Sequence, residues 1–479
     1  MVRARKSASS CASTRQLRWT TTATVASCPT CCGSCWRHER ASTHNFPQGS
    51  ARENQPPLGG RKLRGVSDRG GPIRQALIAG GGIGGLAAAL AASRAGWEVR
   101  LYERTPVFSE VGAGIQLGPN VVRVLHGWGL KTELARVAAF PYRLQVRDAM
   151  SGRELGVLPL GERALQKYGA PYVTVHRADL HDLLLRSVLV QDKVWLNRDS
   201  CLASYEDTGR VVTLKTTQGL EVEGDALIGA DGLWSRVREQ LLLNDGPPRV
   251  TGHLAYRAML PQASLPERLR SQQVTAWLGP KLHVVQYPVR GGDWLNVVAI
   301  VQGQIQSDLQ SWDHSTNAAD LQAAIQLTCA PLRDLIAAVT ECGAQAGPAW
   351  RLWGLCDRPP MRGAHQQAQG RVALLGDAAH PMLPYLAQGA GMAIEDAAEL
   401  GAALAQALDP AFELPALLQR YAQNRWQRNA RVQARALRNG QIFHAEGALR
   451  WGRDASLKVL GQKLLDLPWL YGGTNSNQR

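Results

Sequence analysis

The pattern of apolar and polar positions predicts regular structure from about residue 73 onward. Ala76–Ala79 is a short apolar run of the kind that forms a buried strand. Gly80–Gly85, of which five residues are glycine, follows it, and Leu86–Ala92 then consists of strong helix formers. Trp97–Tyr102 predicts a second strand. The order is therefore strand, glycine-rich turn, helix and strand.

This order is typical of a turn that binds the pyrophosphate of a dinucleotide. Gly80 allows the tight turn, Gly82 lets the backbone approach the phosphates, and Gly85 lets helix and strand pack closely. Glu103 lies 23 residues after Gly80, where an acceptor for a ribose hydroxyl is expected, although it could also be a surface acid. The uncharged stretch Ala76–Ala92 is too short and too rich in glycine for a membrane span.

Two further apolar runs end in an acidic residue. Asp225–Ala230 leads into Asp231 and Gly232, and Arg371–Leu375 leads into Gly376 and Asp377. The carboxyl ends of parallel strands are where ligands lie, so each aspartate could accept hydrogen bonds from ribityl or ribose hydroxyls. A helix cap or turn aspartate is the alternative.

A glycine-rich loop and a helix follow the second of these runs. Pro381–Gly391 leads into a predicted helix at Met392–Leu408. The free N–H groups and the positive dipole at such a helix start would stabilise a reduced flavin. Glu395 and Asp396 are predicted to lie in the first turn, where acids complement the dipole.

The alternating stretch Leu282–Tyr287 predicts a strand with a chemically distinctive face. His283, Val285 and Tyr287 share that face. The unperturbed pKa of histidine, about 6.5, suits a base near neutral pH. A partly exposed sheet histidine beside a core tyrosine is the alternative, and His380 is a second candidate base.

The rest of the chain predicts several strands within Thr251–Val301 and helices at 317–340 and 413–450. The last helix is rich in arginine, and its spacing predicts an exposed, charged face rather than one that binds nucleic acid. Its arginines are Arg420, Arg425, Arg428, Arg431, Arg435 and Arg438. The apolar tail Leu467–Tyr471 is expected to dock on another surface, such as a second subunit.

Charge and cysteine content set the first 72 residues apart. The chain carries a net charge of +15, but residues 1–72 hold twelve Lys/Arg and only three Asp/Glu. This leader resembles a transit segment or upstream sequence translated from a misassigned start, and we expect it to be disordered. Its C-x-x-C pairs, Cys28–Cys31 and Cys32–Cys35, abut without the loop that a zinc site needs, so we expect free thiols. The scattered remaining cysteines favour a reducing, cytoplasmic compartment.

Together, these motifs resemble those of the single-component FAD-dependent aromatic hydroxylases, which are flavoprotein monooxygenases. The likeness covers residues 73–479 and implies an α/β fold: a discontinuous Rossmann-like FAD-binding domain, an inserted β-sheet substrate domain and a C-terminal helical region. The implied segments are the leader at 1–72, the FAD-binding domain at 73–245 and 350–410, the substrate domain at 246–349, and the helical region at 411–479.

Within this family the chain is most similar to 3-hydroxybenzoate 6-hydroxylases. Four stretches carry the likeness: Tyr168–Tyr172 with His176–Leu180, Ala255–Arg257, Gly279–Pro288 and Leu383–Gly389. Salicylate and 6-hydroxynicotinate hydroxylases share much of this pattern. Pro384 is a departure, because some relatives carry a polar side chain there that could reach the substrate.

The resemblance implies tightly bound FAD, transient NADH or NADPH, dioxygen, and a flavin hydroperoxide that hydroxylates a phenolic acid. The implied reaction converts 3-hydroxybenzoate to 2,5-dihydroxybenzoate in aromatic hydrocarbon catabolism. A homodimer is expected, with neither nucleic acid nor membrane as a partner. The alternatives are another flavin monooxygenase of secondary metabolism and, from charge alone, a basic nucleic-acid-binding protein.

The resemblance also carries residue roles, and no metal ligand is predicted. Predicted FAD contacts are Gly80, Gly82, Ile83, Gly84, Gly85, Glu103, Arg104, Arg177, Asp231, Gly376, Asp377, Pro381, Gly389, Ala390 and Gly391. Predicted substrate contacts are Tyr172, Arg257, His283 and Tyr287, of which His283 and Tyr287 are also predicted to be catalytic.

Overall fold

The computed structural model describes residues 74–108, 113–243, 245–303, 319–343 and 349–473. The leader predicted at 1–72, including its paired cysteines, lies outside the described residues. Over the described ranges the strands form two large sheets and two small ones.

The first large sheet contains both strands that flank the glycine-rich turn. Its order is β18 (Ala368–Gln369), β19 (Val372–Leu374), β12 (Ala226–Gly229), β1 (Gln75–Ala79), β2 (Glu98–Tyr102) and β8 (Val194–Asn197). All neighbours are parallel except β18 and β19. The strand order reverses at β1, because β2 lies on one side of it and β12 on the other. Such a reversal opens a ligand crevice at the carboxyl ends of the strands.

Alternation along β1 explains how this sheet is covered on both faces. Ala76 and Ile78 belong to a core shared with helices α1 (Ile83–Arg94), α5 (Arg177–Leu189) and α9 (Gly389–Gln406). Leu77 and Ala79 point the other way and pack on a three-stranded sheet. That small sheet consists of β11 (Glu221–Gly224), β10 (Val212–Thr216) and β9 (Leu202–Asp207).

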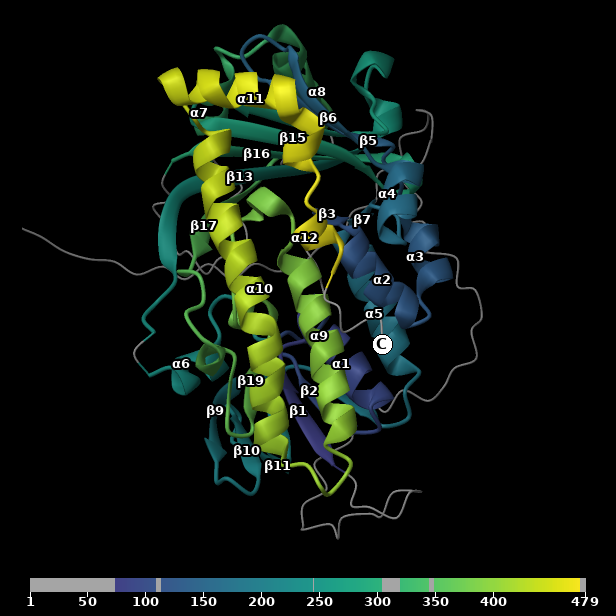
Figure 1. Ribbon diagram of the computed structural model, residues 1–479, viewed down its shortest axis with the longest axis vertical. Helices are drawn as coiled ribbons and strands as arrows, with labels where there is room; N and C mark the ends of the chain where they lie inside the picture. Colours follow the sequence, from purple (N-terminus) through teal and green to yellow (C-terminus); the bar gives the residue numbers. More distant parts are fainter. Residues whose placement is uncertain (1–73, 109–112, 244, 304–318, 344–348, 474–479) are drawn as a thin grey trace, which may run out of the picture. The chain divides into compact units, whose positions relative to one another are not determined.

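The second large sheet takes four of its seven strands from the region around Thr251–Val301, where several strands are predicted. Its order is β17 (Arg351–Asp357), β13 (Arg249–Pro261), β16 (Trp294–Gln302), β15 (Leu282–Val289), β14 (Val274–Gly279), β5 (Arg143–Asp148) and β6 (Glu154–Pro159). Three of these strands, β5, β6 and β17, lie outside the predicted 246–349 segment. Helices α7 (Ala319–Ile325) and α8 (Ala330–Gly343) pack on one face of the sheet (Figure 1).

The remaining elements are short or lie toward the C-terminus. A small sheet contains β3 (Gly114–Leu117), β7 (Val173–His176) and β4 (Ala138–Ala139). The other helices are α2 (Pro119–Gly127), α3 (Lys131–Val137), α4 (Gly161–Tyr168), α6 (Arg236–Leu241), α10 (Leu414–Phe443), α11 (Gly447–Leu465) and α12 (Pro468–Tyr471), with 3-10 turns η5 (Gly376–Ala378) and η6 (Pro384–Leu386). None of the helices in the described ranges has the length and apolar character needed to cross a membrane.

Helix α10 runs beside α9 and holds the loop between β19 and α9 (Figure 1). Three side chains on its inner face donate to backbone carbonyls at the end of β19 and in that loop. Tyr421 donates to the Leu374 carbonyl at 2.9 Å, and Gln433 donates to that of Pro381 at 3.0 Å. Asn439, farther along, donates to the Tyr385 carbonyl at 3.0 Å. The expectation that this helix only spreads charge along an exposed face is therefore wrong for its inner side.

A buried ion cluster lies at the centre of this contact. Arg425 is fully buried and bonds Asp396 through Nε at 2.7 Å and Glu395 through Nη1 at 2.8 Å. Asp396 also accepts from the Gly376 N–H at 3.2 Å and lies 2.5 Å from Nε2 of His380. Burial would raise the pKa of Asp396, but His380 and Arg425 lower it well below its usual range. Because α9 begins at Gly389, these acids lie beyond its first turn and are ion-pair partners, contrary to the predicted dipole role.

The C-terminal segment docks on the same chain. Nη1 and Nη2 of Arg428 donate to the carbonyls of Trp469 and Leu470, each at 2.8 Å, and Arg123 donates to that of Tyr471 at 2.9 Å.

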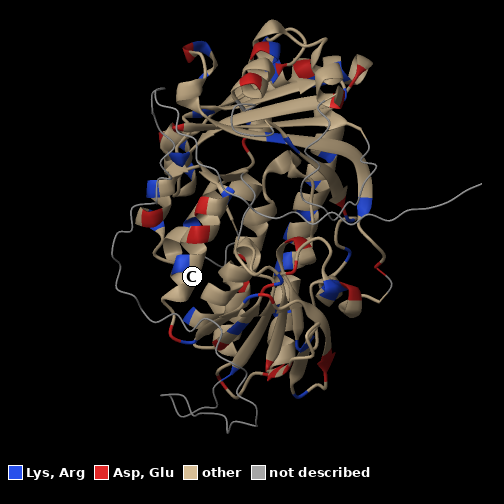
Figure 2. Cartoon of the chain, turned by 180° about the vertical axis from the view of Figure 1, so that it is seen from behind, with Lys and Arg blue, Asp and Glu red and all other residues tan. Residues whose placement is uncertain are grey.

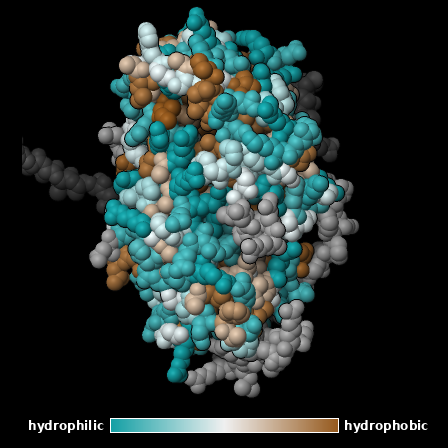
Figure 3. Space-filling view, in the orientation of Figure 1, coloured by the Kyte–Doolittle hydropathy of each residue, from teal (hydrophilic) through white to brown (hydrophobic). Residues whose placement is uncertain are grey.

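A homodimer stays a prediction. Apolar surface gathers over α11 in Figure 3, and this helix carries exposed apolar side chains, among them Leu449 and Val459. On the opposite face, Lys/Arg and Asp/Glu are interspersed (Figure 2).

Replacing Arg425 with methionine should destabilise the protein strongly. The change leaves the carboxylates of Glu395 and Asp396 buried without Arg425, so the free energy of unfolding should fall by about 3–5 kcal/mol. Urea unfolding followed by circular dichroism measures this. Arg420→Met is the matched control, because Arg420 is exposed on the same helix and its loss should cost less than about 0.5 kcal/mol. Equal losses of unfolding free energy in the two variants would show that the ion cluster of Arg425 does not stabilise the protein.

Candidate functional site

The glycine-rich turn has the shape that a bound phosphate requires. Gly80 adopts a φ of +101°, and a Cβ there would lie 2.4 Å from the Ala230 carbonyl oxygen. A Cβ on Gly85 would lie 1.9 Å from the Gly80 oxygen. A Cβ on Gly82 would meet no atom within 4 Å, and Gly82 is the N-cap of α1 without a side-chain cap. The turn therefore leaves open space at the positive end of a helix.

Glu103 faces this turn rather than the surface. Its carboxylate accepts from the Gly81 N–H at 2.7 Å and from both the N–H and the hydroxyl of Thr105, at 2.9 and 2.8 Å. His181 Nε2 lies 2.8 Å from the Gly81 carbonyl oxygen on the other side. Arg104, the next predicted contact, is exposed. Glu103 is thus fixed beside the predicted phosphate site, and its role toward a ribose stays a prediction.

The two aspartates at strand ends are used differently. The Asp231 carboxylate accepts from Ser235 Oγ at 2.5 Å and from the N–H of Arg236 at 2.8 Å, so it caps the start of α6. Asp377 is instead exposed, and its Oδ1 would lie 3.9 Å from a Cβ on Gly389. Asp377 therefore lies at the N-terminus of α9, and its carboxylate is more accessible than that of Asp231. The contacts of Asp231 fit the alternative prediction, that of a helix-capping residue.

Asp377 lies near positively charged side chains, one of which, Arg177, also lies near the second sheet. Desolvation by the surrounding protein raises the pKa of Asp377, although its side chain reaches solvent, while Arg177 and His380 lower it. Arg177 also acts on Arg257 of β13, whose pKa falls through burial and through that positive charge. The predicted contacts Arg177, Asp377 and Arg257 are therefore close enough to interact, although they lie far apart in sequence.

Strand register places the predicted substrate residues in adjacent rows of one sheet face. His283 of β15 pairs with Ile300 of β16, and Tyr287 pairs with Asn296. Between these rows, Val285 pairs with Val298, which in turn pairs with Arg257 of β13. Strands β13 and β15 flank β16, so their backbones lie about 10 Å apart. Arg257 and His283 therefore lie two strands apart on the same face of the sheet.

Several polar atoms on this face are buried without a hydrogen bond to any described residue. They are Nε of Arg257, Nδ2 of Asn296 and the hydroxyl of Tyr385 in η6. The Arg257 guanidinium also stacks 5.0 Å from the centre of the Trp353 ring. Buried polar atoms are seldom left unsatisfied, so these three indicate a ligand with its own donors and acceptors.

Tyr287 and Tyr172 are connected through Gln116 of β3. The Tyr172 hydroxyl donates to Gln116 Oε1 at 2.7 Å, and Gln116 is also close enough to Tyr287 to lower the pKa of that residue. Burial raises the pKa of Tyr287 well above its usual value, although Arg257 and Gln116 lower it. Tyr287 therefore keeps its proton and acts as a hydrogen-bonding group rather than a base. Gly114 must be small, because a Cβ there would lie 2.5 Å from the Tyr287 ring.

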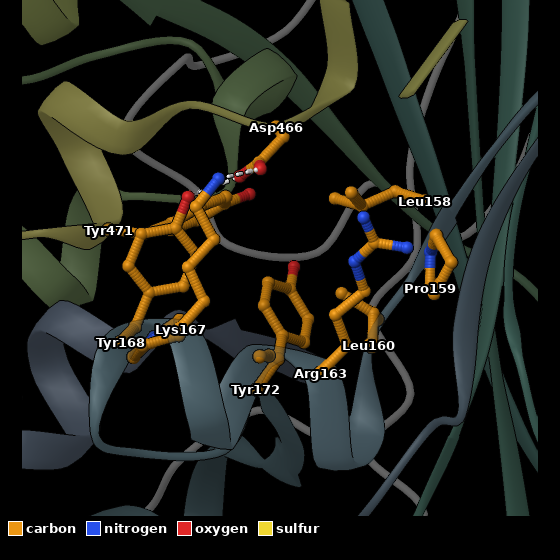
Figure 4. Close-up of a pocket in the computed structure, with 11 residues that line it drawn as sticks. Leu158, Pro159, Leu160, Arg163, Lys167, Tyr168, Tyr172, Asp466 and Tyr471 are labelled. Atoms are coloured by element: carbon orange, nitrogen blue, oxygen red, sulfur yellow. Dashed lines mark hydrogen bonds and ion pairs between the residues drawn. The ribbon is translucent and has the colours of Figure 1, made fainter. Parts of the chain in front are cut away.

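Tyr172 also lines a separate pocket, in which its hydroxyl points between Asp466 and Arg163 (Figure 4). Asp466 bonds Lys167 at 2.5 Å and also accepts from the Tyr168 hydroxyl. None of the predicted FAD contacts lines this pocket. Its walls come from β6, α4, the start of α2 and the C-terminal segment. Of the predicted substrate residues, only Tyr172 lines this pocket.

The two candidate bases lie in different surroundings. His380 is fully buried against Asp396, so Nε2 of its ring is already engaged. His283 lies on the substrate face, and its Nδ1 is 2.7 Å from Nε2 of His444. Burial lowers the pKa of His283 well below its usual value, and His444 and His253 lower it further. His283 is therefore neutral near pH 7.

Four residues of this site were not among the predicted contacts: Gln116, Asn296, Tyr385 and His444. Tyr385 falls within the Leu383–Gly389 stretch that carried the family likeness, so a signal was present. His444 follows the last turn of α10 and gave no sequence signal, because 161 residues separate it from His283.

The fold and the site define a flavin-dependent oxidoreductase with a substrate-covering sheet. A family model described as "FAD binding domain" matches residues 74–436. The chain is 37% identical over 405 residues, 84% of this chain and 96% of the relative, to a 3-hydroxybenzoate 6-hydroxylase of Polaromonas naphthalenivorans strain CJ2. It is 38% identical, with 76% and 90% covered, to a 6-hydroxynicotinate 3-monooxygenase of Bordetella bronchiseptica. Among solved structures, Klebsiella pneumoniae HpxO with FAD and uric acid has a TM-score of 0.70 at 27% identity, covering 82% and 95%.

The chain belongs to the FAD-binding family of aromatic hydroxylases. The α/β fold, the FAD cofactor and the monooxygenase class expected from the sequence are thereby confirmed. The open space at Gly82 and the free start of α9 fit the pyrophosphate and the ring system of that cofactor. The individual contacts to FAD stay predictions.

Replacing Gly82 with alanine should weaken FAD binding without harming the fold. The new Cβ meets no protein atom but occupies the space left for the phosphates. The dissociation constant of FAD, measured by flavin fluorescence, should rise at least about tenfold. The free energy of unfolding of the apoprotein should change by less than about 0.5 kcal/mol. Gly127→Ala, with equally open surroundings on α2, should change neither quantity. An unchanged affinity in Gly82→Ala would place the phosphates elsewhere.

Proposed function

We propose that this chain hydroxylates a phenolic aromatic acid with NAD(P)H and dioxygen, converting 3-hydroxybenzoate to 2,5-dihydroxybenzoate. The observation that carries the proposal is the face of the second sheet on which Arg257 and His283 lie two strands apart, with Nε of Arg257 unpartnered among the described residues. The similarity to 3-hydroxybenzoate 6-hydroxylases supports this choice of acid. When bound, FAD takes a hydride from NAD(P)H and, with dioxygen, supplies the electrophilic oxygen.

The residues of this chain bind and orient the acid. Arg257 binds the substrate carboxylate, which gives its Nε the hydrogen-bond partner that it lacks among the described residues. Val285 and Val298 form an apolar wall against the ring and exclude water. Burial raises the pKa of Tyr287, so its hydroxyl stays protonated and donates or accepts a hydrogen bond at the edge of the substrate ring.

His283 raises the electron density of the ring by acting at the phenol oxygen. Two proton arrangements allow this. An unprotonated Nε2 removes the phenol proton as a base, as predicted from the sequence. A protonated Nε2 instead donates a hydrogen bond to a phenolate oxygen. Both make the ring a better nucleophile.

Product identification tests the proposed substrate. Holoenzyme is incubated with NADH or NADPH and, in parallel, 3-hydroxybenzoate, salicylate and 6-hydroxynicotinate. We expect 2,5-dihydroxybenzoate from the first acid, with one product hydroxyl per NAD(P)H oxidised. Hydroxylation of only one of the other acids would move the assignment to that substrate. NAD(P)H oxidation that yields peroxide alone with all three would remove phenolic acids as substrates.

Replacing Arg257 with leucine should raise KM for the acid by about 10- to 100-fold, because a charge-assisted hydrogen bond contributes about 1.5–3 kcal/mol. The value of kcat should change much less, since the carboxylate lies away from the reacting carbon. Steady-state kinetics measure both quantities. Arg351→Leu is the control: Arg351 pairs in register with Arg257 but is exposed, and its loss should leave KM unchanged. A similar KM in both variants would contradict carboxylate binding by Arg257.

A further inference from the structure

The ring of His283 is held by a single hydrogen bond to another histidine. Its Nδ1 lies 2.7 Å from Nε2 of His444, and the two residues are only 2% and 8% exposed. Burial, reinforced by His253 and Arg453, lowers the pKa of His444 to about 3, and the pKa of His283 is lowered as well. Both rings are therefore neutral, and one hydrogen is shared between the two facing nitrogens.

The surroundings of His444 are asymmetric. Arg453 of α11 donates to the carbonyl oxygens of Ile442 and Phe443, at 3.2 and 2.9 Å, so its positive charge lies at the end of α10 beside His444. Nδ1 of His444 is buried and has no hydrogen-bond partner among the described residues. The other rings packed on the pair belong to His253, Tyr385 and Phe443.

The shared hydrogen can lie on either ring, and the two arrangements differ in cost. If His283 donates, His444 must carry its own hydrogen on Nδ1, as a buried N–H without an acceptor beside a positive charge. If His444 donates, its Nδ1 presents a lone pair, which the charge of Arg453 favours. Buried N–H groups without a partner are rarer than unsatisfied acceptors. The second arrangement is therefore favoured.

We propose that His444 is a positioning residue whose Nε2–H donates to Nδ1 of His283, so that His283 presents Nε2–H to the substrate as a hydrogen-bond donor. The substrate part of this inference rests on the proposed function. The acid then binds as its phenolate, with the phenol proton released to solvent, and the His283 donor stabilises the anionic oxygen. His283 orients and activates the ring without removing its proton, which replaces the role of base predicted for it.

Nitrogen-15 spectra of histidine-labelled holoenzyme test the arrangement without any substrate. Correlations within each ring show which nitrogen carries the hydrogen, and the His283→Gln and His444→Leu variants assign the signals. We expect His283 to carry its hydrogen on Nε2 and His444 to carry its hydrogen on Nε2 as well. A hydrogen on Nδ1 of His283 would overturn the proposal. This outcome does not depend on which acid the enzyme hydroxylates.

Two substitutions of His283 separate a donor from a base. Glutamine keeps an N–H near the position of Nε2 but cannot act as a base at neutral pH. His283→Ala should lose about 10- to 100-fold in hydroxylation rate, the effect of a hydrogen bond to a charged group, and His283→Gln should lose clearly less. A loss of about 100-fold or more in both variants would show that His283 is the base. If the wild-type enzyme hydroxylates no phenolic acid, the proposed function fails while the nitrogen spectra still decide the proton arrangement.

Substitutions of His444 test its positioning role. His444→Gln retains an N–H that can donate to Nδ1 of His283 and should preserve the His283 spectrum and the hydroxylation rate. His444→Leu should give a mixture of both His283 proton arrangements and a slower rate. His253→Leu is the matched control, because His253 packs against His444 at 4.9 Å between ring centres without bonding His283. Equal spectral changes in His444→Leu and His253→Leu would reduce His444 to a packing residue and overturn its role.

Discussion

The buried ion cluster between α9 and α10 is the interaction on which the rest of the site depends. Arg425 bonds the carboxylate of Asp396, and that carboxylate also contacts the loop at the Gly376 N–H and the His380 ring. The ion pair therefore fixes the position of the loop. Isolated charges cannot be buried cheaply, so each member of the cluster requires the others in place. The loop that carries Asp377 and begins α9 is therefore fixed by α10, an element that provides none of the predicted FAD contacts.

The inner face of α10 extends this constraint from one sheet to the other. Its polar side chains fix the loop carbonyls from Leu374 to Tyr385, and at its end His444 reaches His283 on the substrate sheet. One helix thus aligns the loop at the start of α9 with the face on which Arg257 and His283 lie. Relative placement of cofactor and substrate depends on this alignment, because hydroxylation tolerates little error in the distance between reacting atoms.

The electrostatic character of the site changes along this helix. Around Arg425 the side chains are charged and paired, whereas around His283 burial keeps the rings neutral. Neutral rings beside a single cation suit the proposed aromatic acid, whose carboxylate needs that cation and whose ring needs an apolar wall. The sheet face provides both, with Arg257 on β13 and valines on β15 and β16. The fold therefore separates the charges that stabilise the scaffold from the groups proposed to meet the substrate.

The sequence by itself determined the dinucleotide-binding turn, the strand with His283, Val285 and Tyr287 on one face, and the family, because each depends on residues close together in the chain. Only the tertiary structure decided that β5, β6 and β17 join the second sheet, that Arg425 is buried, and that His444 meets His283. An arginine-rich helix has the same periodicity whether its charges meet water or carboxylates. Whether an arginine meets water or a carboxylate depends on residues far away in sequence, and the local pattern contains no information about those residues.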